Sequence, residues 1–158
     1  MMFFGAKLFN GDISQWDVSR VENMVSMFCR AEKFNANITN WNVARVLSMH
    51  RMFSEAKSFS ADISQWNVSN TRDMECMFRY ALSFNCDLSN WNVSSVIKMD
   101  TMFLGLTAYF GDLSQWDISN VQKIRAGGGI VTVHGEDLQR LPTNGYHGLS
   151  FQQILRGQ

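Results

Sequence analysis

Apolar and polar positions recur along this chain with a period of 25 residues. The clearest column holds the five tryptophans: Trp16, Trp41, Trp66, Trp91 and Trp116. A Met-Phe pair begins at Met2-Phe3 and repeats with the same step as Met27, Phe28, Met52, Phe53, Met77, Phe78, Met102 and Phe103. A fixed period between about 20 and 50 residues is typical of stacked repeats, because each unit buries its apolar side chains against its neighbours. We therefore expect these columns to form a continuous structural core.

Within one unit the spacing of apolar residues changes, which predicts two kinds of element. Around Trp16 and Val18, apolar and polar residues alternate, as in a short β-strand. Over residues 21–31 the apolar side chains are three and four apart, as on one face of a helix. Parallel stacking of such units predicts an α/β fold, a leucine-rich-repeat-like solenoid of five 25-residue coils with one short parallel strand and one short helix per coil.

Serine at the start of the predicted helix fits a helix cap. Ser19 is followed by Glu22, the spacing of a capping box, and Ser69, Ser94 and Ser119 occupy the same column. The second unit has Ala44 there. The helix after Ala44 is therefore expected to fray first.

The period ends after Arg125, which divides the chain into two segments. Residues 1–125 form the predicted repeat solenoid, with an incomplete first coil, because the sequence opens at the Met-Phe pair in the middle of a unit. Residues 126–158 form a non-repeat tail that contains most of the glycines, and it is either a degenerate cap or a mispredicted terminus. Within it, a short strand is expected at 130–133 and a short helix from Ser150.

Charge and cysteine content exclude several classes of protein. Fourteen basic and fourteen acidic side chains cancel, so the electrostatic footprint of a nucleic-acid-binding protein is missing. We find no apolar run of about 18 residues, so no membrane span is expected in this chain. Its opening, Met-Met-Phe-Phe, is too short and uncharged for a signal peptide. The spacing of Cys29, Cys76 and Cys86 fits neither a disulfide framework nor a metal site, and no cofactor or metal is expected.

Catalytic residues are not apparent. His50, His134 and His147 share no column, and neither do the cysteines, so no nucleophile and base can be placed together. Two columns hold only Asp or Asn, and their members are Asp12, Asn37, Asp62, Asp87, Asp112 and Asp17, Asn42, Asn67, Asn92, Asp117. Such side chains either bind turn backbone or chelate calcium. The missing glycine framework and the asparagines favour the turn role.

Positions that the period leaves free are the candidates for binding. Arginine and tyrosine are favoured in protein interfaces, and the candidates are Arg20, Arg45, Arg51, Arg72, Arg79 and Tyr80. The alternative is a solvated helix face of mixed charge. A polar row on the predicted sheet, formed by Gln15, Asn40, Gln65, Asn90 and Gln115, is a further alternative for binding glycans or ice.

The repeated unit Phe-Asn-x-Asp-Ile-Ser-x-Trp-Asp-Val-Ser, present at residues 9–19 and continued by Met24, Met27, Phe28 and Ala31, resembles the BspA-like leucine-rich-repeat surface proteins. That family includes bacterial surface proteins and lipoproteins, with related repeats in protists and algae. The resemblance implies a cell-surface or secreted, non-enzymatic module for adhesion or protein binding, with a protein or extracellular-matrix ligand. The alternative is an intracellular scaffold or structural fragment of a larger repeat protein, which the free cysteines favour. The oligomeric state is not predicted.

Overall fold

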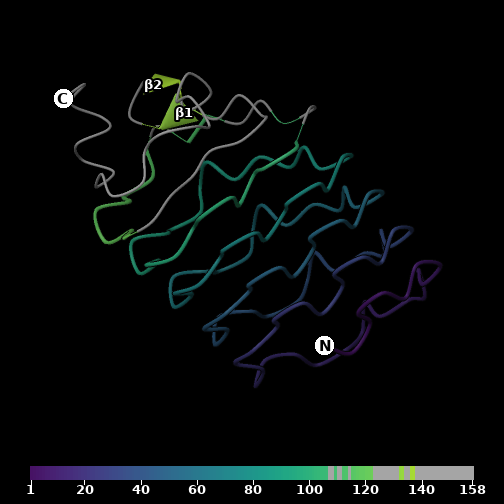
Figure 1. The fold of residues 1–158 in the computed structure, drawn as a ribbon. Helices are drawn as coiled ribbons and strands as arrows, with labels where there is room; N and C mark the ends of the chain where they lie inside the picture. The colour runs from purple at the N-terminus through teal and green to yellow at the C-terminus, as the bar shows by residue number, and fades with distance from the viewer. Residues whose placement is uncertain (107–108, 110–111, 114, 123–131, 134–135, 138–158) are drawn as a thin grey trace.

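Stacked coils make up the body of the protein. The computed structural model describes residues 1–106, 109, 112–113, 115–122, 132–133 and 136–137. The coils follow one another from the purple N-terminal end to the green region (Figure 1). Apart from isolated bridges, the only regular elements in the described part are β1 (Thr132–Val133) and β2 (Glu136–Asp137), which pair antiparallel with Thr132 opposite Asp137. Strand β1 lies within the segment 130–133, whereas the helix predicted from Ser150 lies outside the described residues.

The prediction of an α/β leucine-rich-repeat-like solenoid is wrong. No described residue is helical, and the segment around Trp16 and Val18 contains no strand. Tight turns occupy both places instead. The N–H of Trp16 donates to the carbonyl of Ile13 at 3.1 Å, and the N–H of Val21 donates to the carbonyl of Val18 at 2.9 Å. What repeats every 25 residues is therefore a series of turns, held in register by contacts between coils.

The segment predicted as a helix forms a ladder to the next coil. The N–H groups of residues 24, 26, 28 and 30 donate to the carbonyls of Ser48, His50, Met52 and Ser54 at 2.8–2.9 Å. Between these rungs, the N–H of Met27 bonds back to the carbonyl of Met24 at 3.2 Å. Parallel bridges join Asn23 to Ser48, Ser48 to Asp73 and Asp73 to Lys98. Backbone N–H and C=O groups that would pair within a helix are therefore paired between coils. A helix and this ladder of turns both bury apolar residues that are three and four positions apart, so the sequence pattern fits either one.

Left-handed backbone conformations explain why no helix forms there. Two columns of this ladder have positive φ, at 53–57° for Ser26, Arg51, Cys76 and Thr101 and at 55–61° for Arg30, Glu55 and Tyr80. Gly5 and Gly105 lie in the second column and also have positive φ. A left-handed residue costs roughly 1–2 kcal/mol and ends a right-handed helix, so a helix cannot pass these positions.

The serine column lies in turns, where its backbone N–H groups are capped by Asp or Asn side chains, and it does not begin helices. The backbone N–H of Ser19 donates to Oδ1 of Asp17 at 3.0 Å, and the N–H of Ala44 donates to Oδ1 of Asn42 at 3.2 Å. Because the donor is a backbone group, alanine serves as well as serine. The prediction that a helix frays after Ala44 is wrong, since no helix follows it.

Aromatic side chains fill the interior in continuous files. The rings of Phe28, Phe53, Phe78 and Phe103 stack with centroids 5.8–6.2 Å apart from coil to coil. Trp41, Trp66, Trp91 and Trp116 are buried, as are Met52, Met77 and Met102. Met27 is only partly buried, and Trp16 is 41% exposed. Trp16 belongs to the first coil, and no described residue covers its outer side.

Candidate functional site

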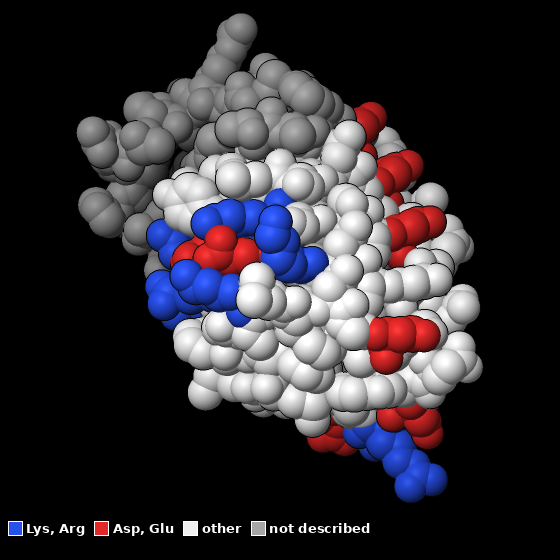
Figure 2. Space-filling model, turned by 90° about the vertical axis from the view of Figure 1, so that its right-hand side faces the viewer, with Lys and Arg blue, Asp and Glu red and all other residues white. Residues whose placement is uncertain are grey.

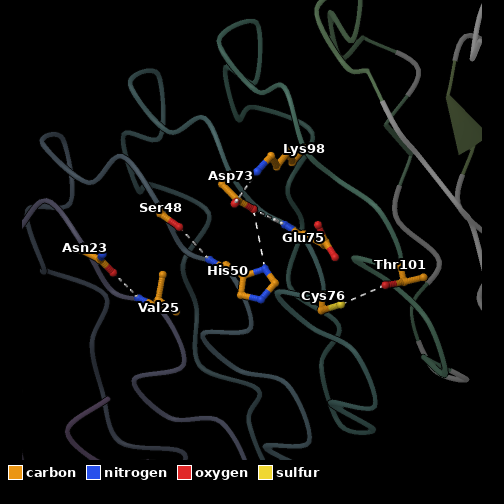
Figure 3. Close-up of polar contacts among 9 residues, drawn as sticks. All are labelled: Asn23, Val25, Ser48, His50, Asp73, Glu75, Cys76, Lys98 and Thr101. Carbon is orange, nitrogen blue, oxygen red and sulfur yellow. Dashed lines mark hydrogen bonds and ion pairs between the residues drawn. The ribbon is translucent and has the colours of Figure 1, made fainter.

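Side chains that project from the ladder form a surface that differs from coil to coil. We name as the ladder face the outward residues of two columns, Asn23, Ser48, Asp73 and Lys98 together with Val25, His50, Glu75 and Asp100. Asp100 is buried, and the other seven are at least partly exposed. Figure 3 shows most of them on neighbouring coils. No residue type recurs in either column, in contrast to the Trp and Phe columns of the core.

Asp73 joins three coils at the centre of the ladder face. Its Oδ1 accepts the backbone N–H of Glu75 at 3.0 Å and lies 3.8 Å from Nδ1 of His50 (Figure 3). Its Oδ2 lies 4.0 Å from Nζ of Lys98. The side chains of Asp73 and His50 are about one quarter exposed, and that of Lys98 is 56% exposed. The carboxylate therefore lies between polar groups from both adjacent coils.

This arrangement contains the atoms of a possible metal site. His50, Asp73 and Glu75 each offer one ligand atom, and these atoms lie within 4.8 Å of one another. An imidazole and two carboxylates are a donor set that zinc accepts. Two features oppose a cation, because Oδ1 of Asp73 already accepts a backbone N–H and the Lys98 ammonium lies beside Oδ2. The geometry supports a polar network better than a metal centre.

Further side-chain contacts lie along the ladder segment beyond the ladder face, one of them at the buried Cys76. Sγ of Cys76 lies 3.0 Å from Oγ1 of Thr101 in the next coil. The guanidinium of Arg79 lies over the Tyr80 ring, 4.9 Å from its centroid. The Tyr80 ring in turn covers Gly105, where an added Cβ would lie 2.1 Å from the ring. Tyr80 is 39% exposed, so it combines a fixed ring with an accessible edge.

The residues predicted to bind a partner do not form one cluster. Arg45 pairs with Glu22 at 3.1 Å, and Arg79 stacks on Tyr80. Arg20, Arg51 and Arg72 are exposed. Lys and Arg side chains gather around a few carboxylates on one face of the molecule, while a separate file of carboxylates follows the coils at one side (Figure 2).

The network at Asp73 was missed from the sequence. Its signal is that Asp73 and Lys98 share a column, with His50 two positions beyond that column in the preceding coil. The sequence indicates this network only when it is known that residues 48, 73 and 98 pair between neighbouring coils. His50 by itself gave no indication of a partner.

The Asp and Asn columns bind turn backbone. Oδ1 of Asp12 accepts the N–H of Ser14 at 2.9 Å, and Oδ1 of Asn37 accepts the N–H of Thr39 at 3.1 Å. The hydrogen bond from the backbone of Ser14, with a second from its side chain, holds the pKa of Asp12 below its usual value. The turn role that the sequence favoured is therefore the one these side chains perform.

The chain matches a protein-family model described as "Mycoplasma protein of unknown function, DUF285", over residues 1–81 and over residues 37–127. The chain belongs to this family. The resemblance to BspA-like leucine-rich-repeat surface proteins is corrected accordingly, because the matching family is DUF285 and the strand and helix of a leucine-rich repeat are missing from the described residues. No curated protein and no solved structure matches the chain. DUF285 itself carries no assigned function.

Among the described residues, we find no helix with the length and hydropathy needed to cross a bilayer. This agrees with the expectation drawn from the apolar runs.

Proposed function

We propose that this DUF285 protein is a non-enzymatic binding module whose ladder face recognises a protein or extracellular-matrix ligand. The observation that supports the proposal is the contrast between the interior and this face. Aromatic columns repeat in type from coil to coil, whereas the bridge column reads Asn23, Ser48, Asp73 and Lys98. Stacked repeats use a constant interior to hold a variable binding surface.

A second argument is that the ladder face is held rigid. Hydrogen bonds at 2.7–3.0 Å join successive coils along the ladder, and Asp73 also accepts the backbone N–H of Glu75. A surface that is ordered before binding loses less conformational entropy when a partner docks. Arg79 and Tyr80 extend this surface with residue types that dominate interface energetics.

The low reactivity of two cysteines supports the non-enzymatic part of the proposal. Burial raises the pKa of Cys29, and burial raises the pKa of Cys86 to about 11. The thiolate is the reactive form of cysteine, so both side chains are weak nucleophiles at neutral pH.

Binding to purified ligands tests the proposal. We expect saturable binding of the full chain to at least one matrix protein in a panel containing fibronectin and fibrinogen, measured by surface plasmon resonance. Replacing Asp73→Asn together with Tyr80→Ala should weaken it about tenfold or more. The matched control is Asp17→Asn, which lies outside the ladder face and should bind as the unmodified chain does. Equal loss in both variants, or no binding across the panel, would contradict the proposal.

An intracellular scaffold is the second candidate, because the three cysteines are unpaired, as suits a reducing compartment. Cell fractionation in the source organism separates it from the surface or secreted location, which stays a prediction. Recovery from the cytosol would favour the scaffold, and labelling of intact cells by an impermeant reagent would favour the surface module.

A further inference from the structure

A hollow of about 420 Å³ is lined by residues of two successive coils. Its lining includes Cys86, Asp87, Ser89, Tyr109, Asp112 and Gln115. None of these residues belongs to the ladder face or to the arginine and tyrosine candidates named from the sequence. The volume falls within the range of about 300–1,000 Å³ found for small-molecule sites.

Tyr109 occupies a core position that other coils fill with phenylalanine. The column reads Phe9, Phe34, Phe59, Phe84 and Tyr109. The Tyr109 ring stacks on Phe84 with centroids 5.8 Å apart, and the side chain is only 1% exposed. The Tyr109 ring therefore packs in the core as the phenylalanines of this column do, and its hydroxyl is a polar group that they lack.

That hydroxyl is buried and has no hydrogen-bond partner in the described structure. A buried polar group without a partner is destabilising, and one that lines a hollow can be satisfied by a ligand. Burial, with a smaller contribution from the charge of Asp87, raises the pKa of Tyr109. The hydroxyl therefore keeps its proton at neutral pH and offers both a donor and an acceptor.

The charge of the hollow is negative. Asp87 and Asp112 are among the lining residues, and no lysine or arginine is found among the described residues of the lining. Hydrogen bonds from Ser89 keep the pKa of Asp87 below its usual value, although the charge of Asp112 acts in the opposite direction. With a pKa of about 11, the Cys86 thiol is neutral at physiological pH. The ligand that fits is a cation.

We propose that this hollow binds a small organic cation with a primary ammonium group, which pairs with Asp87 and Asp112 and donates to the Tyr109 hydroxyl. An ammonium has three N–H donors, and two carboxylates and a hydroxyl oxygen supply three acceptors. Calcium is the competing cation, but it requires six to eight oxygen ligands, and part of this lining is the sulfur of Cys86.

The repeats supply variants that preserve the fold. Tyr109→Phe restores the residue of the other coils and removes only the hydroxyl. Asp87→Asn removes the charge but keeps the turn, since Asn37 makes the same Asx hydrogen bond in its coil. Asp12→Asn is the matched control, because Asp12 occupies the same column in the first coil and does not line the hollow.

Isothermal titration calorimetry of the full chain with 1,4-diaminobutane at low ionic strength tests the proposal. We expect saturable one-site binding, weakened about tenfold or more in Asp87→Asn and in Tyr109→Phe, and unchanged in Asp12→Asn. A parallel titration with calcium chloride should show weaker binding. Absence of saturable diamine binding, equal affinities of Asp87→Asn and Asp12→Asn, or tighter binding of calcium would each overturn the proposal.

Melting curves without ligand give a second readout. Tyr109→Phe should melt above the unmodified chain, because it removes an unpartnered buried hydroxyl. Added diamine should raise the melting temperature of the unmodified chain and leave that of Tyr109→Phe nearly unchanged. An equal increase in both proteins would show that the hydroxyl plays no part in binding.

Discussion

The indole Nε1 of Trp66 donates a hydrogen bond of 3.1 Å to the backbone carbonyl of Ile38, 28 residues earlier. Trp41, Trp91 and Trp116 make the same bond to Ile13, Ile63 and Leu88 at 3.0–3.1 Å. Each of these four tryptophans therefore fills the core of its own coil and ties it to the preceding one. The side chains of phenylalanine and leucine have no N–H group, so neither can make this hydrogen bond in place of tryptophan.

Removing this side chain in the middle of the stack should destabilise the protein far more than removing it at the end. We expect Trp66→Ala to cost about 3–5 kcal/mol, because it leaves a cavity between coils. Trp16→Ala should cost less, since Trp16 is 41% exposed. Urea unfolding followed by circular dichroism measures both. Equal losses would show that the coils are not held mainly by their nearest neighbours.

Trp66→Phe separates the hydrogen bond from the ring. It retains most of the buried area but removes the indole donor, while the Ile38 carbonyl still accepts the backbone N–H of Trp41. The loss of one of two hydrogen bonds should cost about 0.5–1.5 kcal/mol in the same unfolding experiment. Trp16→Phe is the matched variant, because no indole hydrogen bond is found for Trp16 in the described structure. A Trp66→Phe protein as stable as Trp16→Phe would mean that the indole bond contributes nothing.

Gly105 should not tolerate a side chain while Tyr80 is present. Its φ is +79°, and an added Cβ would lie 2.1 Å from the Tyr80 ring. We expect Gly105→Ala to destabilise the protein by about 1–3 kcal/mol, and Tyr80→Ala in the same chain to restore part of the loss. A double-mutant cycle measured by denaturant unfolding gives the coupling. Additive effects would show that the ring and the glycine do not touch in solution.

The Cys86 thiol should react slowly and only at high pH. Burial raises its pKa from 9.0 to about 11, so at pH 8 its thiolate fraction is about 100-fold lower than that of an unperturbed thiol. The rate of alkylation should rise until about pH 11. A chain with Cys29→Ser and Cys76→Ser keeps Cys86 as its single thiol. Both serines are compatible with the fold, because Ser54 occupies the column of Cys29 and Ser26 occupies the column of Cys76. A rate that levels off near pH 9 would contradict the burial of Cys86.

Acid should weaken the turns that aspartate caps. Hydrogen bonds from Ser19 hold the pKa of Asp17 below the ordinary 3.8 of the unfolded chain. The stabilisation is therefore present above about pH 4 and is lost as pH falls through the lowered pKa of the folded state. Asp17→Asn keeps the turn, as Asn42 does, and has no proton to gain. Melting temperatures from pH 2 to 5 should fall less steeply for Asp17→Asn, and parallel curves would refute the assignment.

The period of 25 was enough to predict the stacking and the columns that face inward, because burying Trp and Phe in register is a property of the sequence alone. The local conformation was not predictable in this way. Apolar residues three and four apart fit a helix and a run of tight turns equally, and the left-handed positions are occupied by Ser26, Arg30 and Arg51, which give no signal of positive φ. Gly5 and Gly105, in the same column as Arg30, were the one available indication.

The candidate sites were predictable only in part. Arg79 and Tyr80 were chosen by residue type, and the structure places them in contact. The ion pairs around Asp73 depend on which residues adjoin across coils, and that requires the inter-coil hydrogen bonds. Tyr109 was visible as the exception in a phenylalanine column, but the hollow beside it arises from the shape of the turns.

The bridges from Asn23 through Ser48 and Asp73 to Lys98 step by 25 residues each time. If 25 residues were deleted from the middle of the chain, the following coil would take the place of the lost one. Its Trp and Phe side chains would still stack on those of the coil before it. Inserting a copy would do the same. A chain shortened or lengthened by one such unit should therefore still fold, with a different set of exposed residues over an interior of the same kind.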